Sequence, residues 1–228
     1  MLLLNGLSPA QIFTLRFIIA YLLLLGYSMT KNHRWFSNMW QDEMLMFALG
    51  VTGGSLYFLT ENSAMNYTTT TNTSLIVSLS PLVAALLISL FYKSMRLNRV
   101  QTIGMLMAAV GVVAVVLNGH FVLHLSPLGD SLAFSAALCW GFYSLLMIPA
   151  NLKYETVFVT RKVFFYGLLS MVPYYILIPE EARIFTSLYS FFTSHYSLLW
   201  NLLFLSCVAS MPGQRAGRKY ASRKRAPA

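Results

Sequence analysis

Long runs of apolar residues follow one another along the chain and are separated by short polar stretches. About 20 apolar residues in helical form cross roughly 30 Å of hydrocarbon, so windows of that length predict membrane-spanning helices. The runs are continuous rather than alternating at every second residue, which favours helices over a barrel. We predict full spans at 9–28, 44–63, 68–92, 99–117, 128–149 and 155–178, with a shorter helix at 197–211.

The composition supports an all-α, multipass transmembrane helical bundle. The chain is 57% hydrophobic and only 10% charged, whereas a typical soluble domain has roughly 25% charged residues. Its net charge of +9 does not indicate binding to nucleic acid, because six of the sixteen Lys and Arg residues fall within 215–228 and others lie in short loops. We therefore expect the lipid bilayer, and no nucleic acid, as a partner.

Basic loops alternate with loops that carry little positive charge, and cytoplasmic loops are the ones enriched in Lys and Arg. The basic segments are 29–43, 93–99, 150–154 and the tail. The other loops are 61–67 and 118–127, which have no Lys or Arg, and 179–196, which has one arginine beside two glutamates. This pattern predicts that residue 1 lies outside and the tail inside.

Two apolar segments, IFTLRFIIAYLLLL and VFVTRKVFFYGLLSM, resemble each other. One constant shift aligns Phe13 with Phe158, Arg16 with Arg161 and Tyr21 with Tyr166. Matched leucines arise easily by chance, but an arginine at the same place in two membrane helices is less easily dismissed. The charge pattern sends the two helices through the membrane in opposite directions, so we interpret the repeat as inverted, which is typical of alternating-access transporters.

The residues also resemble a known family. PLGDSLAFSAALCWGFYSLLMIPANLKY is similar to the start of the second half of an EamA-type member of the drug/metabolite transporter superfamily. LSPAQIFTLRF resembles that family's second helix, and the stretch from GVTGGSLYFL to MLMAAVGVVAVV resembles its third to fifth helices. The resemblance covers roughly 5–210 and implies ten helices in two inverted five-helix repeats that move small metabolites.

The chain departs from this pattern at both ends. We predict a first repeat at 1–119 without its first helix, a partial second repeat at 120–211, and a basic, disordered or aberrant tail at 212–228. LLWNLLFLSCVAS starts like LMFALGVTGGS of the first half and then gives way to the tail. The alternative for the tail is a genuine basic segment held by anionic lipid. With the second repeat incomplete, we expect the chain alone to be inactive or rescued by self-association as a homo-oligomer.

Charged residues at membrane depth are the first candidates for solute binding. Arg16 and Arg161 each lie about seven residues inside their helices, where the alternative role is to reach the headgroups. Glu61 lies near the end of the second span. It could bind a cationic substrate, exchange a proton, pair with Arg16, or stay solvated at the interface.

Uncharged polar and aromatic residues supply the other candidates. Asn72 and Ser74 continue a polar stretch into the third span, whereas Asn66 is interpreted as part of a surface loop together with its neighbour Tyr67. Trp140 is three residues from Tyr143, so the two share a helix face and could stack on a planar or cationic solute. The alternative for this aromatic pair is helix packing or an interface belt.

Other motifs predict local structure rather than chemistry. Small residues at helical spacing, which let helices approach closely, are Gly50 with Gly54, and Gly104 with Ala108 and Gly111. Asp130 is expected to cap the fifth span, and Pro81 and Pro173 to interrupt spans. His120 and His124 have a metal-binding spacing but no third ligand nearby. No phosphate-binding loop occurs, so we expect no metal and no cofactor.

These observations favour transport of small organic solutes by alternating access, in an integral protein of the bacterial inner (cytoplasmic) membrane. The alternative of another class is a seven-helix membrane receptor, which shares the outside start and inside end but is not an inverted duplication. An enzyme is not expected, because the chain has no paired aspartates, Ser-His set or His-Glu-x-x-His helix.

Overall fold

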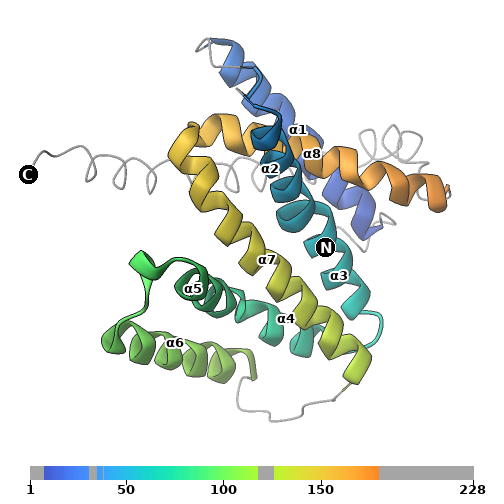
Figure 1. Cartoon of the computed structure of the whole chain (residues 1–228). Coiled ribbons are helices and arrows are strands. Elements are labelled where there is room, and N and C mark those ends of the chain that lie inside the picture. Colours follow the sequence, from blue (N-terminus) through green and yellow to red (C-terminus); the bar gives the residue numbers. More distant parts are fainter. Residues whose placement is uncertain (1–7, 31–34, 38, 118–125, 180–228) are drawn as a thin grey trace, which may run out of the picture. The chain divides into compact units, whose positions relative to one another are not determined.

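The computed structural model describes residues 8–30, 35–37, 39–117 and 126–179 (Figure 1). Within these residues the regular elements are all helices, as predicted. They are α1 (Pro9–Thr30), α2 (Trp40–Gly50), α3 (Tyr57–Ala64), α4 (Thr70–Ser78), α5 (Ser80–Phe91), α6 (Arg99–Leu117), α7 (Pro127–Lys153) and α8 (Thr156–Leu177), with a π-helical segment at Val51–Leu56 and a short 3-10 turn at Lys93–Met95.

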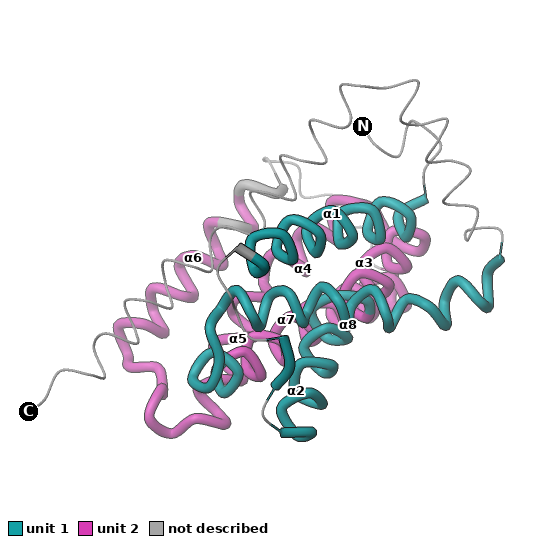
Figure 2. The backbone as a smooth tube through the Cα atoms, turned by 90° about the horizontal axis from the view of Figure 1, so that it is seen from above, with its two compact units in different colours: residues 1–55, 148–228 teal, residues 56–147 magenta. Residues whose placement is uncertain are grey.

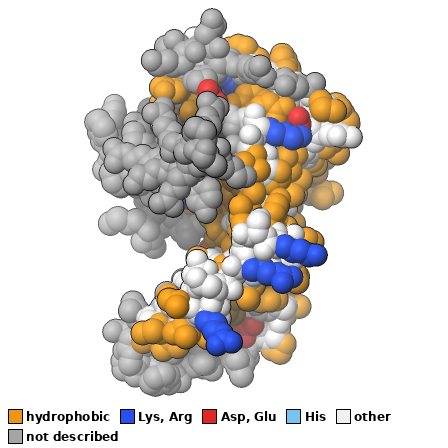
Figure 3. All heavy atoms as spheres, turned by 60° about the vertical axis from the view of Figure 1, so that its left-hand side comes forward, with side chains coloured by type: hydrophobic (Ala, Val, Ile, Leu, Met, Phe, Trp, Pro, Cys, Tyr) orange, Lys and Arg blue, Asp and Glu red, His pale blue; other side chains and the backbone are white. Residues whose placement is uncertain are grey.

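Four helical stretches in the described part of the chain are long and apolar enough to cross a membrane. They are Pro9–Met29, Trp40–Ala64, Thr70–Phe91 and Pro127–Lys153. Hydrophobic side chains occupy much of the described surface in Figure 3, as expected for helices that face lipid. The chain is thus an all-α, multipass membrane protein. The predicted spans that correspond to α6 and α8 are helices of 19 and 22 residues, and the predicted helix at 197–211 lies outside the described residues.

Side chains at the helix starts satisfy backbone N–H groups that have no partner within the helix. Before α1, Ser8 and Gln11 form reciprocal bonds, with each side chain accepting the other residue's N–H at 3.3 and 3.1 Å. Such a capping box fixes where a helix begins. At the start of α7 the carboxylate of Asp130 accepts the N–H of Ser126 at 3.1 Å. The predicted capping role of Asp130 is therefore confirmed.

A proline follows the division of one predicted span, but prolines inside two other helices do not end them. The third predicted span is divided at Leu79 between α4 and α5, two residues before Pro81, so the predicted interruption there is confirmed. Pro173 lies inside α8, which continues through it without the interruption we expected. Pro149 likewise lies inside α7. A proline in a helix removes one backbone hydrogen bond but does not always end the helix.

The chain divides into two compact units, coloured separately in Figure 2. Unit 1 comprises 1–55 and 148–228, and unit 2 comprises 56–147. The chain passes from one to the other within the π-helical segment and again within α7, next to Pro149. These units are defined by packing, and the predicted repeat boundaries at 119 and 211 remain a prediction.

In unit 1, α8 packs against both α1 and α2, and Figure 2 shows α1 and α8 side by side. The hydroxyl oxygens of Thr14 and Tyr175 lie 2.7 Å apart, while Arg161, at the other end of α8, donates to Ser28. The two helices are therefore antiparallel. This is the direction that the inverted repeat predicts for them.

Glycine allows α2 and α8 to approach closely. A Cβ atom on Gly50 would lie 2.7 Å from the backbone nitrogen of Gly167 and from Cβ of Tyr166, closer than side-chain atoms can pack. The predicted packing role of Gly50 is confirmed. At Gly104 and Gly111 of α6 an added Cβ would have no described atom within 4 Å, so no described helix makes the close contact that we expected there.

In unit 2 the beginning of α7 packs against the turn before α4. A Cβ atom on Gly129 would lie 2.7 Å from Cβ of Thr68, and the Thr68 hydroxyl donates to Asp130 at 3.2 Å. Farther along α7, Gly141 lies against side chains of α5. The turn that follows the predicted outer loop 61–67 and the start of α7 thus lie at the same end of unit 2.

Candidate functional site

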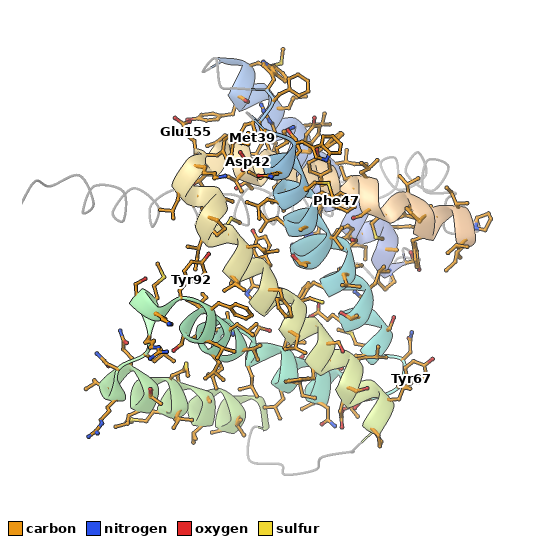
Figure 4. All side chains as sticks on the ribbon, viewed as in Figure 1. Met39, Asp42, Phe47, Tyr67, Tyr92 and Glu155 are labelled. Carbon is orange, nitrogen blue, oxygen red and sulfur yellow. The ribbon has the colours of Figure 1, made fainter. Side chains whose placement is uncertain are left out.

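Two consecutive carboxylates begin α2 and join it to the α7–α8 region of unit 1. Asp42 is 4% exposed, and it accepts hydrogen bonds from Lys153 Nζ at 2.6 Å and from the Tyr154 hydroxyl at 2.7 Å. Figure 4 labels Asp42 and Met39 at the start of α2, and Glu155 just before α8. The predicted cytoplasmic loops 29–43 and 150–154 therefore meet at one end of unit 1.

Glu43 repeats this arrangement with another lysine and tyrosine. Its carboxylate accepts from Lys162 Nζ at 2.8 Å, from the Tyr166 hydroxyl, and from the backbone N–H of Ser37 at 3.1 Å. Acidic residues are favourable in the first turn of a helix because the partial charge there is positive. Glu43 thus lies in the first turn of α2 and attaches this helix to α8.

Arg161 lies beside this ion pair and is only 3% exposed. It donates to the Ser28 hydroxyl and, at 3.5 Å, to the Trp35 carbonyl. Its guanidinium carbon lies 5.1 Å from the centre of the Trp35 ring and 5.5 Å from that of Phe158. Ring faces attract cations, so aromatic side chains replace part of the hydration that the buried guanidinium loses.

These groups line an open pocket of about 550 Å³ that lies entirely within unit 1. Most of its lining is aromatic, with two cations and one carboxylate. The lining residues are Tyr21, Trp35, Phe36, Ser37, Met39, Trp40, Glu43, Arg161, Lys162, Phe165 and Tyr166. We call this space the α1–α2–α8 pocket.

The two repeat-related arginines have different surroundings. Arg161 lines the α1–α2–α8 pocket, whereas Arg16 is half-buried on α1 and is not part of its lining. Within the described part of the chain, the Arg16 side chain makes no ion pair. The repeat-related tyrosines, Tyr21 and Tyr166, both line the pocket.

Unit 2 brings together three of the residues predicted to bind solute. The ring centres of Trp140 and Tyr143 lie 5.3 Å apart, and Tyr57 of α3 lies 5.4 Å from Trp140. Tyr57 and Glu61 lie about one turn apart on α3 and so share a face of that helix. Neither the sequence pattern nor the resemblance pointed to Tyr57, which contacts Trp140.

Asn72 and Ser74 are close in sequence but differ in environment. Asn72 is 3% exposed and its side-chain nitrogen donates to the Thr68 hydroxyl at 3.3 Å, whereas Ser74 is exposed. Asn66 and its neighbour Tyr67 are also exposed, as the surface-loop interpretation requires. Figure 4 labels Tyr67 at the turn after α3 and Tyr92 at the end of α5. The candidates His120 and His124 lie outside the described residues.

The lysines and acids that join α2 to α7 and α8 were missed at the sequence level. The two residues of each pair are separated by more than a hundred positions in the sequence, as in Glu43 and Lys162. A signal did exist: two adjacent acidic residues at the edge of a predicted span, in a chain that is only 10% charged. Charges are costly at the membrane unless they are paired or solvated, so partners at the same membrane side could have been sought.

Comparison with known proteins supplies the family. The model of the EamA-like transporter family matches residues 2–117 of the chain, which is half of its 228 residues. The chain belongs to the EamA-like transporter family. It is also 25% identical over 182 residues to an uncharacterized transporter of Archaeoglobus fulgidus, a match that covers 78% of this chain and 60% of that protein. No solved structure matches the chain.

Family membership confirms the resemblance found in the sequence. The chain is an integral, multipass protein of a family of membrane transporters. This assignment favours transport over the receptor alternative and points away from an enzyme. The chain spans about three fifths of the length of the Archaeoglobus relative.

Proposed function

We propose that this EamA-like protein moves small organic solutes across the membrane by alternating access. The main support is the antiparallel packing of α1 and α8, seen in the Thr14–Tyr175 and Ser28–Arg161 contacts. Two similar helices of opposite direction can exchange conformations, so that a site is opened to one side and then to the other.

The residues proposed to bind solute are found in both units. In unit 2, Trp140 and Tyr143 offer ring faces, and Glu61 shares a face of α3 with Tyr57, whose ring contacts Trp140. A carboxylate beside aromatic rings suits a planar or cationic solute. The remaining candidates, each proposed from sequence, are Arg16, Asn72, Ser74 and Arg161. The surrounding bilayer is proposed to be the bacterial cytoplasmic membrane.

Side-specific labelling tests the mechanism. In a variant with Cys139 and Cys207 replaced by serine, single cysteines are placed at Thr14 and at Ser37, near opposite ends of unit 1. A membrane-impermeant maleimide is applied from each side with and without a panel of small organic solutes. A transported solute should raise the labelling rate at one position and lower it at the other.

The labelling rate at Asn66→Cys serves as the control, because Asn66 is exposed at a turn and should react equally with and without solute. Alternating access is contradicted if the rates at Thr14 and Ser37 change in the same direction. It is also contradicted if no solute in the panel changes either rate while the protein remains folded.

A further inference from the structure

The α1–α2–α8 pocket has more positive than negative charge in its lining. Arg161 and Lys162 are the cations among its lining residues, and Glu43 is the carboxylate. The two cations are only 3% and 9% exposed. The lining residues thus carry two positive charges and one negative charge, and this net positive charge favours an anionic occupant.

The carboxylate of Glu43 is already engaged. It accepts from Lys162, from Tyr166 and from the N–H of Ser37, and a carboxylate has about four acceptor positions. A cationic ligand would therefore have to share this carboxylate with Lys162, which already contacts it at 2.8 Å. The geometry disfavours a cation in this pocket.

Arg161 provides a group that matches an anion in shape as well as in charge. Its acceptors here include two neutral oxygens, the Ser28 hydroxyl and the Trp35 carbonyl. A guanidinium carries five N–H donors in a planar fork that fits a carboxylate. A ligand carboxylate offers a stronger, charge-assisted bond than a neutral oxygen does.

The rest of the pocket favours a flat apolar body. Six of its lining residues are aromatic: Tyr21, Trp35, Phe36, Trp40, Phe165 and Tyr166. Aromatic rings favour offset-stacked or edge-to-face contacts with other rings. The volume of about 550 Å³ falls within the range of known small-molecule sites.

We propose that the α1–α2–α8 pocket binds small organic anions that combine one carboxylate with a flat aromatic body. Arg161 holds the carboxylate and the ring walls hold the body. The Glu43–Lys162 ion pair stays intact and holds α8, which carries Arg161, against α2. This is a binding site within unit 1, and its occupation requires no movement of solute across the membrane.

Isothermal titration calorimetry tests the charge preference on the unmodified 228-residue protein in phosphatidylcholine nanodiscs. The probes are 2-naphthoate, neutral 2-naphthamide and 2-naphthylmethylammonium, which share one ring system. Naphthoate should bind about tenfold tighter than naphthamide, because a hydrogen bond to a charged group is stronger than one to a neutral group. Equal affinities, or a preference for the ammonium, would overturn the proposal.

Two variants locate the binding. Arg161→Gln should lower naphthoate affinity about tenfold and leave naphthamide binding unchanged, while Arg96→Gln, in an exposed loop of unit 2, should change neither. Because Arg161 is buried, Phe165→Ala provides a second test at a side chain that is 41% exposed. It should weaken both probes, and unchanged binding of both would overturn the proposal.

A lipid headgroup can also present an anionic group. A competition experiment therefore distinguishes a lipid from a soluble organic anion as the ligand of the pocket. Dihexanoylphosphatidylglycerol is added to the naphthoate titration in neutral nanodiscs. We expect no displacement of naphthoate; displacement that is lost in Arg161→Gln would assign the pocket to lipid and overturn the proposal. Calorimetry measures binding at equilibrium, so naphthoate binding can be detected even if no solute changes the labelling rates. The binding proposal and the transport proposal can therefore fail separately.

Discussion

The hydroxyl oxygens of Thr14 and Tyr175 lie 2.7 Å apart, although the residues belong to the first and last described helices. Tyr175 also donates to the carbonyl of Ala10 at 2.9 Å. With the Arg161–Ser28 contact at the opposite end, these bonds hold α1 and α8 together along most of their length. Hydrogen bonds of this kind help membrane helices to associate, because the alternative is a polar group in hydrocarbon.

A disulfide between the π-helical segment and α8 should form readily. The hydroxyl oxygens of Ser55 and Ser170 lie 2.7 Å apart, so sulfur atoms at these positions can approach the roughly 2 Å of a disulfide bond with little movement. In a variant with Cys139 and Cys207 replaced, Ser55→Cys with Ser170→Cys should cross-link on mild oxidation. Mass spectrometry of the digested protein detects the linked peptides.

The matched control for that disulfide pairs Ser55→Cys with Thr160→Cys. Thr160 lies about 15 Å from Ser170 along α8. It should give little cross-linked product under the same oxidation. Equal yields from both pairs would contradict the packing of α8 against this segment.

Adding a methyl group at Gly50 should destabilise the protein. The new Cβ would lie 2.7 Å from a backbone atom of α8, so Gly50→Ala should cost about 1–3 kcal/mol of unfolding free energy through overpacking. Thermal unfolding in detergent measures the change. The control is Gly104→Ala, where the added Cβ would have no described atom within 4 Å. The higher helix propensity of alanine should raise the unfolding free energy of this control by up to about 1 kcal/mol. A Gly50→Ala protein as stable as the control would show that α2 and α8 are not in contact.

The two ion pairs at the start of α2 should differ in strength. Lys162 and Glu43 have side-chain exposures of 11% and 16%, whereas Lys153 is 55% exposed beside Asp42 at 6%. Water screens an exposed charge, so the double-mutant coupling energy should be about 1–3 kcal/mol for Glu43–Lys162 and clearly smaller for Asp42–Lys153.

The variants for these two cycles are Glu43→Gln with Lys162→Met, and Asp42→Asn with Lys153→Met. Unfolding free energies of the single and double variants, measured by chemical denaturation in mixed micelles, give each coupling energy. Coupling energies in the reverse order would show that burial does not decide the strength of these pairs.

The charge pattern predicts on which side the loops lie. Cysteine at Asn66 should react with an impermeant maleimide added to intact cells, and cysteine at Arg96 only after the cells are permeabilised. Both positions are exposed in the structure, so lack of reaction cannot be attributed to burial. Labelling in the reverse pattern would contradict the predicted orientation.

The sequence predicts most of the described helices because the required length of apolar residues is a local property. The antiparallel direction of α1 and α8 could also be predicted, since the repeated arginine and the loop charges together define an inversion. The division at Leu79 was predicted only approximately, from Pro81. The open surroundings of Gly104 were not predicted, because spacing alone does not show whether another helix lies opposite.

The candidate site was predicted less well than the fold. Arg161 lies in the α1–α2–α8 pocket, and Trp140 and Tyr143 form one aromatic cluster with Tyr57, which shares a face of α3 with Glu61. The repeat predicted matching roles for the two arginines, but Arg161 is nearly buried and Arg16 is not. Which side chains surround a residue depends on packing between distant segments, and a one-dimensional pattern does not contain that information.

The chain crosses between its two units where each helix is mechanically weakest. One crossing falls in the π-helical segment Val51–Leu56, and the other falls next to Pro149 in α7. A π-helical turn and an internal proline both disturb the regular ladder of backbone hydrogen bonds, and helices bend preferentially at such places. A bend at either crossing would therefore leave the secondary structure on either side of it intact.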